Sequence, residues 1–335
     1  MGCGRGTQRI ALVIHASIVV PIALVACPAS AAAFCQMTTE GGEECSDEGI
    51  PLAWETRCIS FSVDARNDQN LSEEVVRGAT QRAFQTWTSQ HCNASDKPHF
   101  YAQLTREPAF CKEAEFCRDR GNANVISFSE TWPPRRLGER VDLNPNAQAS
   151  TLLSFNTRTG EIVDADILLN AQTWSFQQCL RENCLGEDRT RLDLENVLAH
   201  EVGHLLGLAH PGDEPVTATM FRSQNPGETQ KRTLHPDDIA GFCAIYGARA
   251  LTLPCDPTPV GGFEPDCESG EPCRVAGSSG CAVNSATADA RPSENLYWLA
   301  TILGLVRLRR RRRLRLAGDR ARPREDMQVG VAPPG

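Results

Sequence analysis

The sequence lacks several features that mark whole classes of protein. None of its 15 cysteines stands in C-x2-C spacing, which argues against a Cys-rich zinc ribbon. Basic residues are scarce in the middle of the chain. The first 33 and last 29 residues hold 12 of the 34 Lys and Arg but only 3 of the 42 acids, so residues 34–306 keep 22 basic and 39 acidic residues and a net charge of −17. A segment this acidic argues against binding to nucleic acid or to an anionic membrane surface.

Residues 1–33 have the composition of an export signal. Arg5 and Arg9 precede an apolar stretch, and small residues follow it as far as Phe34. Cleavage after Ala31 or Ala33 fits the usual small-residue pattern. Residues 24–27 also resemble a bacterial lipobox, so processing at Cys27 stays open as an alternative.

The cysteine count agrees with export. Thirteen cysteines follow Cys27, and setting Cys281 aside leaves an even set of twelve. Ten of these are close neighbours in sequence: Cys35/Cys45, Cys58/Cys92, Cys111/Cys117, Cys179/Cys184 and Cys267/Cys273. They predict local disulfides formed in an oxidising compartment, although sequence alone does not establish connectivity.

The most informative stretch runs from His200 to His210 and reads H-E-x-x-H-x-x-G-x-x-H. On a helix, His200 and His204 lie on one face, so both imidazoles can bind one metal ion. Glu201 lies one step round that face, where its carboxylate can take a proton from metal-bound water. Gly207 can adopt a positive φ that ends the helix and turns the chain back, bringing His210 to the same ion. Three neutral imidazoles with one open position predict a catalytic zinc site, because structural zinc has four protein ligands.

The alternative is an amphipathic core helix that carries stray histidines. Leu194, Leu198, Val202 and Leu205 already supply a separate apolar face, which favours the metal site. The remaining histidines that follow Phe34, at positions 91, 99 and 235, are scattered, so a single zinc ion is predicted. Calcium stays open at the Asp/Asn-rich stretch Asp142–Asn146 but has no support, since such loops are common without it.

The histidine motif resembles the signature of the metzincin metalloproteases, in which a Met-turn follows. Thr217–Phe221 is a candidate Met-turn, and the resemblance implies that Met220 forms an apolar floor beneath the histidines. Leu234–Gly247 resembles the closing helix of the matrixin branch, and Arg222 stands where some other branches carry a tyrosine ligand. The sequence shows neither the cysteine switch of that family nor the paired His/Asp ligands of its second, structural zinc.

The resemblance implies an α+β fold, with a metzincin-like mixed five-stranded sheet, an active-site helix and a C-terminal helix. Hydrophobic alternation and capping residues predict the elements themselves. We expect strands at 58–63, 99–105, 124–128, 151–155 and 162–169, a helix capped by Ser72, the zinc helix capped by Thr190, and a last helix opened by Pro236 and closed by Gly247. By resemblance, Thr151, Leu152, Leu153, Ser154 and Phe155 form the edge strand that pairs with an extended peptide substrate. A plain hairpin strand is the alternative.

The C-terminal part differs in composition. Residues 251–295 are rich in Pro, Gly, Ser and Asp, as expected of a linker or small disulfide-bonded appendage. The apolar run 296–306 has eleven residues, short of the roughly 20 that span a bilayer, and an Arg cluster follows it. Cys281, the apolar run and this cluster resemble the surface-sorting tails of exported myxobacterial proteins, which implies attachment at Cys281. A plain membrane anchor and a basic nucleic-acid-binding tail are the alternatives.

Together these features predict four regions: a signal peptide (1–33), a catalytic domain (34–250), a linker (251–295) and a sorting tail (296–335). The predicted activity is zinc-dependent hydrolysis of peptide bonds, with Glu201 as general base and a peptide or protein as substrate. The predicted location is the surface of a Gram-negative cell or its surroundings, with the C-terminal tail at the membrane; nothing in the sequence indicates an oligomeric state. One alternative is a catalytically silent, surface-anchored binding module of the same fold, and another is a zinc hydrolase that acts on something other than peptides.

Overall fold

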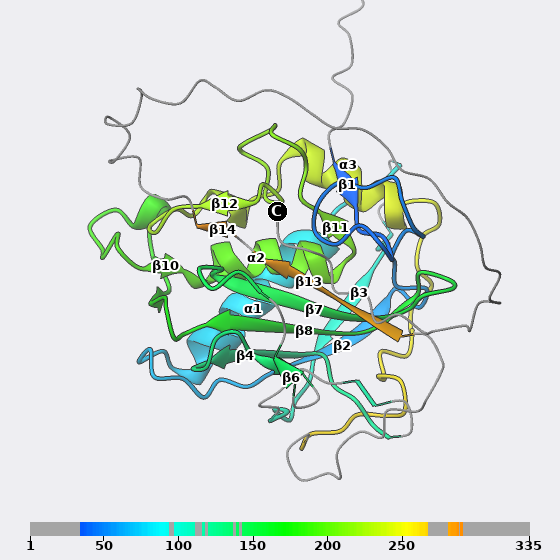
Figure 1. Ribbon diagram of the computed structural model, residues 1–335, viewed down its shortest axis with the longest axis horizontal. Coiled ribbons are helices and arrows are strands. Elements are labelled where there is room, and N and C mark those ends of the chain that lie inside the picture. The colour runs from blue at the N-terminus through cyan, green and yellow to red at the C-terminus, as the bar shows by residue number, and fades with distance from the viewer. Residues whose placement is uncertain are drawn as a thin grey trace, which may run out of the picture. The chain divides into compact units, whose positions relative to one another are not determined.

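The computed structural model describes residues 34–93, 97–110, 116–117, 120–136, 139–140, 143–266, 281–287 and 289–290 (Figure 1). The signal peptide predicted for residues 1–33, its lipobox alternative and the sorting tail predicted for 296–335 lie outside the described residues. Within the described part of the chain, no helix is both long and apolar enough to cross a bilayer.

The main sheet has six strands in the order β13-β7-β8-β4-β2-β3. Their bounds are β2 Cys58–Val63, β3 Tyr101–Leu104, β4 Val125–Ser129, β7 Ala149–Asn156, β8 Ile162–Asn170 and β13 Cys281–Thr287. Neighbouring strands from β3 to β8 run parallel, whereas β7 runs antiparallel to β8. These five form the mixed sheet expected from sequence. The sixth strand, β13, comes from the C-terminal part of the chain and pairs with β7 at the outer edge.

Within the residues that the structure describes, three α-helices accompany the sheet: α1 Glu73–Thr88, α2 Leu194–Leu205 and α3 Pro236–Tyr246. Ser72 caps α1 as predicted, and Pro236 and Gly247 bound α3 as predicted. The cap predicted for α2 is wrong. Asp193, not Thr190, accepts the first free amide, Asn196 N, at 2.8 Å. The Thr190 hydroxyl is engaged in its own turn, where it donates to Asp188 at 2.6 Å.

Short elements complete the fold. They are β1 Cys35–Gln36 with β11 Leu208–Ala209, β9 Phe176–Gln177 with β10 Leu192–Asp193, β12 Ser223–Gln224 with β14 Asp289–Ala290, β5 Arg135–Arg136 with β6 Glu139–Arg140, and the single turns η1 Glu182–Cys184 and η2 Gln230–Arg232. The β1–β11 pair holds the start of the described chain against the segment that leads to His210.

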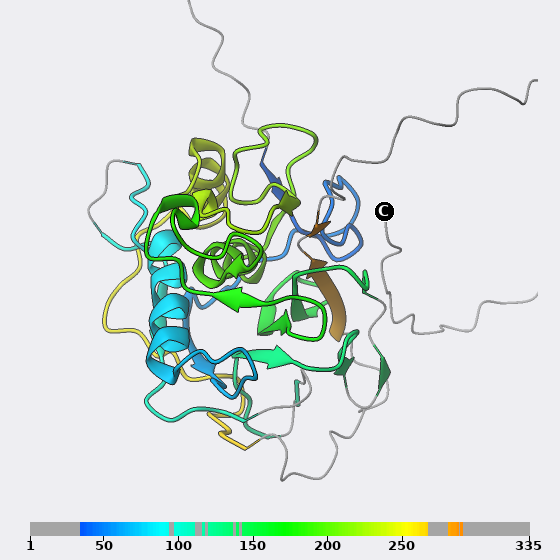
Figure 2. The ribbon, with the colours of Figure 1, turned by 90° about the vertical axis from the view of Figure 1, so that its left-hand side faces the viewer.

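The core lies between the sheet and the two helices α1 and α2, which pack side by side (Figure 2). The apolar stripe predicted for α1 is buried here, and Phe84 stacks on Phe61 of β2 with ring centroids 3.8 Å apart. Trp87 also fixes α2 directly, because its Nε1 donates to Ala199 O at 2.8 Å. The helix that carries the histidine motif is therefore held on a packed base.

Disulfides link distant parts of the chain. The predicted Cys35–Cys45 and Cys179–Cys184 bonds are present. The predicted Cys58/Cys92 pairing is wrong, since Cys58 bonds with Cys255 and Cys92 with Cys243. The reason lies in the path of the chain. Cys58 is at the start of β2, whereas Cys92 follows the far end of α1, where it lies beside Cys243 of α3. Cys117 is also disulfide-bonded, while Cys111, Cys267 and Cys273 lie outside the described residues.

Residues 251–266 stay in contact with the rest of the fold. Besides the Cys255 disulfide, Phe263 bridges to Asn122 and Asp266 bridges to Phe110. The start of the predicted linker therefore lies along the catalytic domain, and the boundary at residue 250 stays a prediction.

Candidate metal centre and active site

The three histidines of the motif meet at one point. Their Nε2 atoms lie 3.1 Å apart for His200 and His204, 3.2 Å for His204 and His210, and 3.3 Å for His210 and His200. Zinc at about 2.0–2.1 Å from each nitrogen in a tetrahedral site requires ligand nitrogens about 3.3 Å apart. All three side chains are buried. The donor set and its spacing thus fit one zinc ion.

Backbone carbonyls orient two of the ligands. His200 Nδ1 lies 2.6 Å from Thr219 O, and His204 Nδ1 lies 2.8 Å from Leu208 O. A hydrogen on each Nδ1 leaves the Nε2 lone pair facing the shared point, which is the tautomer that a metal ligand needs. Burial lowers the pKa of both histidines well below the usual value, so both are neutral at pH 7.

The position of the third ligand, His210, depends on residues near the start of the described chain. Gly207 has φ +88°, and a side chain there would meet Leu52 O at 2.5 Å, so the turn predicted after α2 requires glycine. His210 N then donates to Glu43 O at 2.7 Å. Glu44 Oε1 lies 3.6 Å from His210 Nδ1, and this contact with the imidazole lowers the pKa of Glu44. The sequence pattern had not indicated Glu44 as a partner of the site.

Glu201 points from α2 toward β7. Its Oε2 accepts a hydrogen bond from Thr151 Oγ1 at 2.8 Å, and the side chain is fully buried. Burial raises the pKa of Glu201 to about 8, while the Thr151 hydrogen bond and the charge of Lys231 act in the opposite direction. A bound divalent cation would also lower the pKa of Glu201, because its charge favours the carboxylate form. Thr151 therefore joins the predicted edge strand to the predicted catalytic residue.

Met220 lies beneath the histidine helix. A side chain at Gly203 would meet Met220 Sδ at 2.1 Å and Trp87 Cζ2 at 2.8 Å, so glycine in α2 makes room for the Met-turn. Asp238 of α3 holds the turn in place: its carboxylate accepts from Thr219 N at 2.7 Å and from Met220 N at 3.0 Å. Asp238 was not predicted, because the Met-turn and α3 meet only in the fold.

Lys231 is a third unpredicted residue of the centre, after Glu44 and Asp238. Its side chain is fully buried, Nζ lies 3.3 Å from His200 Nδ1, and the ammonium donates to Phe221 O. Burial lowers the pKa of Lys231 to about 7, although the carboxylates of Glu201 and Asp238 raise it. Its positive charge is one reason why the pKa of His200 is low.

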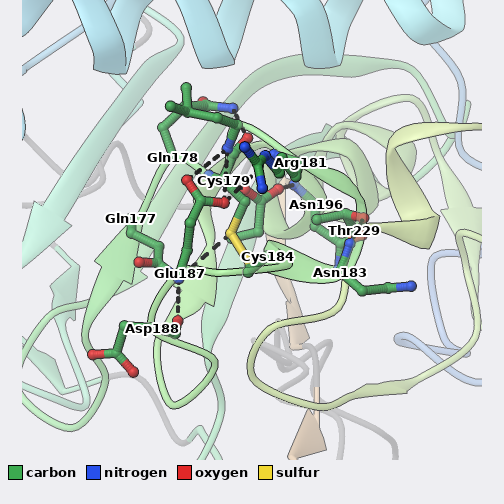
Figure 3. Close-up of a disulfide and its surroundings, with 12 residues drawn as sticks. Gln177, Gln178, Cys179, Arg181, Asn183, Cys184, Glu187, Asp188, Asn196 and Thr229 are labelled. Atoms are coloured by element: carbon green, nitrogen blue, oxygen red, sulfur yellow. Dashed lines mark hydrogen bonds between the residues drawn. A yellow bond between two sulfur atoms is a disulfide. The ribbon is translucent and has the colours of Figure 1, made fainter.

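Among the described residues, one other cluster gathers metal-ligand atoms: Cys179, Cys184 and Glu187. The two sulfurs form a disulfide, so they are not thiolate ligands (Figure 3). The Glu187 carboxylate is also engaged, since it accepts from Leu180 N at 3.1 and 3.0 Å. Cys179 N donates to Asp193, the cap of α2, at 2.9 Å. This cluster supports the start of the histidine helix and is not a metal site.

The predicted edge strand, β7, lies against this centre, but it is not at the edge of the sheet in this structure, because β13 pairs with its outer side. Thr151, Leu153 and Phe155 project from β7 on one face, where Thr151 reaches Glu201 and the other two join the main core. Leu152 projects on the opposite face into a smaller cluster with Trp132 and Leu168. Cys281 is the first residue of β13, and its backbone pairs with Asn156.

Comparison with known proteins supports this geometry. The family model for matrixin matches residues 115–247, which include β4, β7, β8, α2, the Met-turn and α3. Residues 115–247 of this chain are matrixin-like.

Individual metalloproteinases are also similar to parts of this chain. Over 77 residues the chain is 42% identical to metalloendoproteinase 1-MMP of Arabidopsis thaliana, covering 23% of this chain and 19% of the relative. Over 215 residues it is 26% identical to human neutrophil collagenase, covering 61% of this chain and 38% of the relative. Over 55 residues it is 49% identical to metalloendoproteinase 1 of Glycine max, covering 16% and 17%. The chain thus spans well under half the length of these relatives.

Proposed function

We propose that this matrixin-like chain is a zinc-dependent endopeptidase with a single catalytic zinc ion. The observation that carries the proposal is the convergence of three buried Nε2 atoms, with the buried Glu201 next to the first of these ligands in α2. His200, His204 and His210 would hold the ion. When bound, zinc supplies an activated water and polarises the scissile carbonyl.

Glu201 is the proposed general base. The Glu201 side chain is buried next to the first ligand in α2, and the charge of a bound zinc ion would favour its carboxylate form, which can take a proton from water near neutral pH. Glu201 would accept this proton at a carboxylate oxygen and pass it to the nitrogen of the leaving amine. The Thr151 hydroxyl, 2.8 Å from Oε2, holds the carboxylate in one orientation during both transfers.

The proposed substrate is an extended peptide. In this structure β13 occupies the outer edge of β7. Once that edge is vacated, its backbone N–H and C=O groups would be open to a peptide, which would pass close to Glu201 through Thr151. Phe221–Thr233, the segment between the Met-turn and α3, would line the pocket for the side chain that follows the scissile bond.

Export is part of the proposal. Four disulfides among the described residues fit an oxidising compartment. Attachment through Cys281 at the surface of a Gram-negative cell stays a prediction from sequence resemblance alone.

A catalytically silent binding module of the same fold is the second candidate. Binding zinc requires the histidines but not Glu201, so a silent module has no need of a buried carboxylate held by Thr151. The retained Glu201–Thr151 pair therefore favours the enzyme.

The Glu201→Ala variant separates the two candidates. It removes the base but no ligand, so we expect unchanged zinc content and a loss of about 10²–10⁴-fold in the hydrolysis of labelled casein. Glu74→Ala, at an exposed position of α1, is the matched control and should keep the parental rate. A Glu201→Ala variant that retains half of the parental rate would show that this mechanism is wrong.

A further inference from the structure

The outer edge of β7 is paired with another part of the same chain. Residues 281–287 run antiparallel to β7, with Cys281 opposite Asn156 and Thr287 opposite Ser150. In Figure 1 this strand, coloured orange, lies along β7 near α2. Every position of the predicted substrate-binding strand, Thr151–Phe155, has its partner in β13.

The same segment continues to the opposite side of the centre. Asp289 and Ala290 form β14, which pairs in parallel with Ser223 and Gln224 of β12. The β12 strand begins three residues after Met220, at the start of the segment proposed to line the substrate pocket. Residues 281–287 thus pair with β7, and residues 289–290 pair with β12 on the other rim of the centre.

The register places a particular part of this segment at the catalytic residue. Ala286 is opposite Thr151, whose hydroxyl donates to Glu201. Paired strands are about 4.8 Å apart, so the backbone at Ala286 lies one strand spacing from the residue that holds the base. The pairing with β7 ends at Thr287, and the pairing with β12 begins at Asp289.

We propose that β13 and β14 occupy the cleft of their own chain as its first substrate, blocking it to other peptides until a bond between Ala286 and Asp289 is cut. The proposal rests on the endopeptidase activity proposed above. In this step water adds across one peptide bond: its oxygen bonds to the carbonyl carbon, the C–N bond breaks, and the leaving nitrogen receives a proton. The products are a chain that ends in a carboxylate and a released C-terminal fragment.

A proline pair tests the occupancy. In an edge strand, successive N–H groups point alternately toward and away from the neighbouring strand, so Asn284→Pro with Ser285→Pro removes one N–H that faces β7, whichever it is. Asn284→Thr with Ser285→Thr is the matched control, because threonine favours strands. Both pairs lie outside the residues assigned to zinc binding and catalysis.

Hydrogen exchange measures occupancy without any need for activity. In the full-length, zinc-loaded Glu201→Ala chain, we expect the amides of 281–287 and of the facing β7 to exchange at least about tenfold more slowly than in the same chain with the proline pair. The threonine pair should keep the protection. Equal exchange in all three proteins would overturn the proposal, even if the enzyme proved active on casein.

Mass spectrometry of the intact chain and its products shows whether the proposed bond is cut. After zinc is added to the Glu201 parent, we expect a C-terminal fragment that begins at residue 287, 288 or 289. Its first-order rate constant should stay the same on tenfold dilution, because the reaction is intramolecular. The proline pair should hydrolyse casein without the initial lag of the parent. A parent that cleaves casein at once while its own chain stays intact would overturn the proposal; no casein hydrolysis by any variant, with β13 still protected, would instead overturn the proposed endopeptidase activity.

Discussion

Among the described residues, two clusters each bring three metal-ligand atoms within 4.8 Å of one another, yet the clusters have different roles. In one, His200, His204 and His210 present nitrogen lone pairs to a shared point, and their outer nitrogens face carbonyls or Glu44. In the other, Cys179 and Cys184 have used their sulfurs in a bond with each other. The difference teaches that proximity of donor types does not define a metal site. What defines it is whether surrounding groups leave the lone pairs available.

The largest expected effect is on the histidine cluster itself. His210→Ala removes a ligand, so zinc affinity should fall by more than the roughly 10–100-fold that loss of an outer partner costs, and casein hydrolysis should fall with it. His200→Ala and His204→Ala should behave alike. Competition with a chromogenic chelator measures the affinity, and His91→Ala is the control. Normal zinc affinity in His210→Ala would mean that the site has two histidines and a carboxylate.

A smaller effect is expected from the partner of His210. Glu44→Gln keeps the shape but removes the charge that faces Nδ1, so we expect zinc affinity to fall by about tenfold, near the low end of the range for outer partners. Half of the Glu44 side chain is exposed, and solvent screens the contact. Glu48→Gln, four residues on, is the control. If both variants bound zinc equally well, His210 would be oriented by its backbone contacts alone.

Sequence spacing predicted the histidine cluster because all its main requirements are local. The ligands, Glu201, Gly207 and Met220 lie within 21 residues and have the positions that the motif implies. Glu44, Asp238 and the Cys58–Cys255 bond were missed since each joins segments that meet only after folding. Periodicity identified the strands to within a few residues for the same local reason, and it contained no signal that residues 281–287 would add to the sheet.

The next effect concerns packing under the histidines. Gly203→Ala places a methyl group into Met220 and Trp87, so we expect a loss of about 1–3 kcal/mol in the free energy of unfolding and a few-fold weaker zinc binding. Thermal and urea denaturation measure the change in the free energy of unfolding. Gly212→Ala is the matched control, because no atom lies within 4 Å of a side chain placed there. Equal stability of the two variants would show that Met220 moves aside freely.

The smallest expected effect on zinc binding comes from removing the disulfide of the Cys179/Cys184/Glu187 cluster. Cys179→Ala with Cys184→Ala should leave zinc content and affinity unchanged, while the loss of a short disulfide loop lowers stability by about 2 kcal/mol. Zinc titration and denaturation of the same samples test both parts. A drop in zinc stoichiometry would contradict the assignment of this cluster as structural.

The Cys58–Cys255 bond also determines what a single cut does to the molecule. It closes a covalent ring that runs from the start of β2 past the end of α3, and the Cys92–Cys243 bond closes a second ring inside it. A nick in any loop between residues 58 and 255 leaves both pieces joined, so the damage is visible only after reduction. Residues 287–335 contain no cysteine and lie outside the ring, so a cut just before them frees the fragment entirely. A cut within the ring therefore leaves both pieces of the chain joined by a disulfide, whereas a cut in the segment beside β7 releases the C-terminal piece irreversibly.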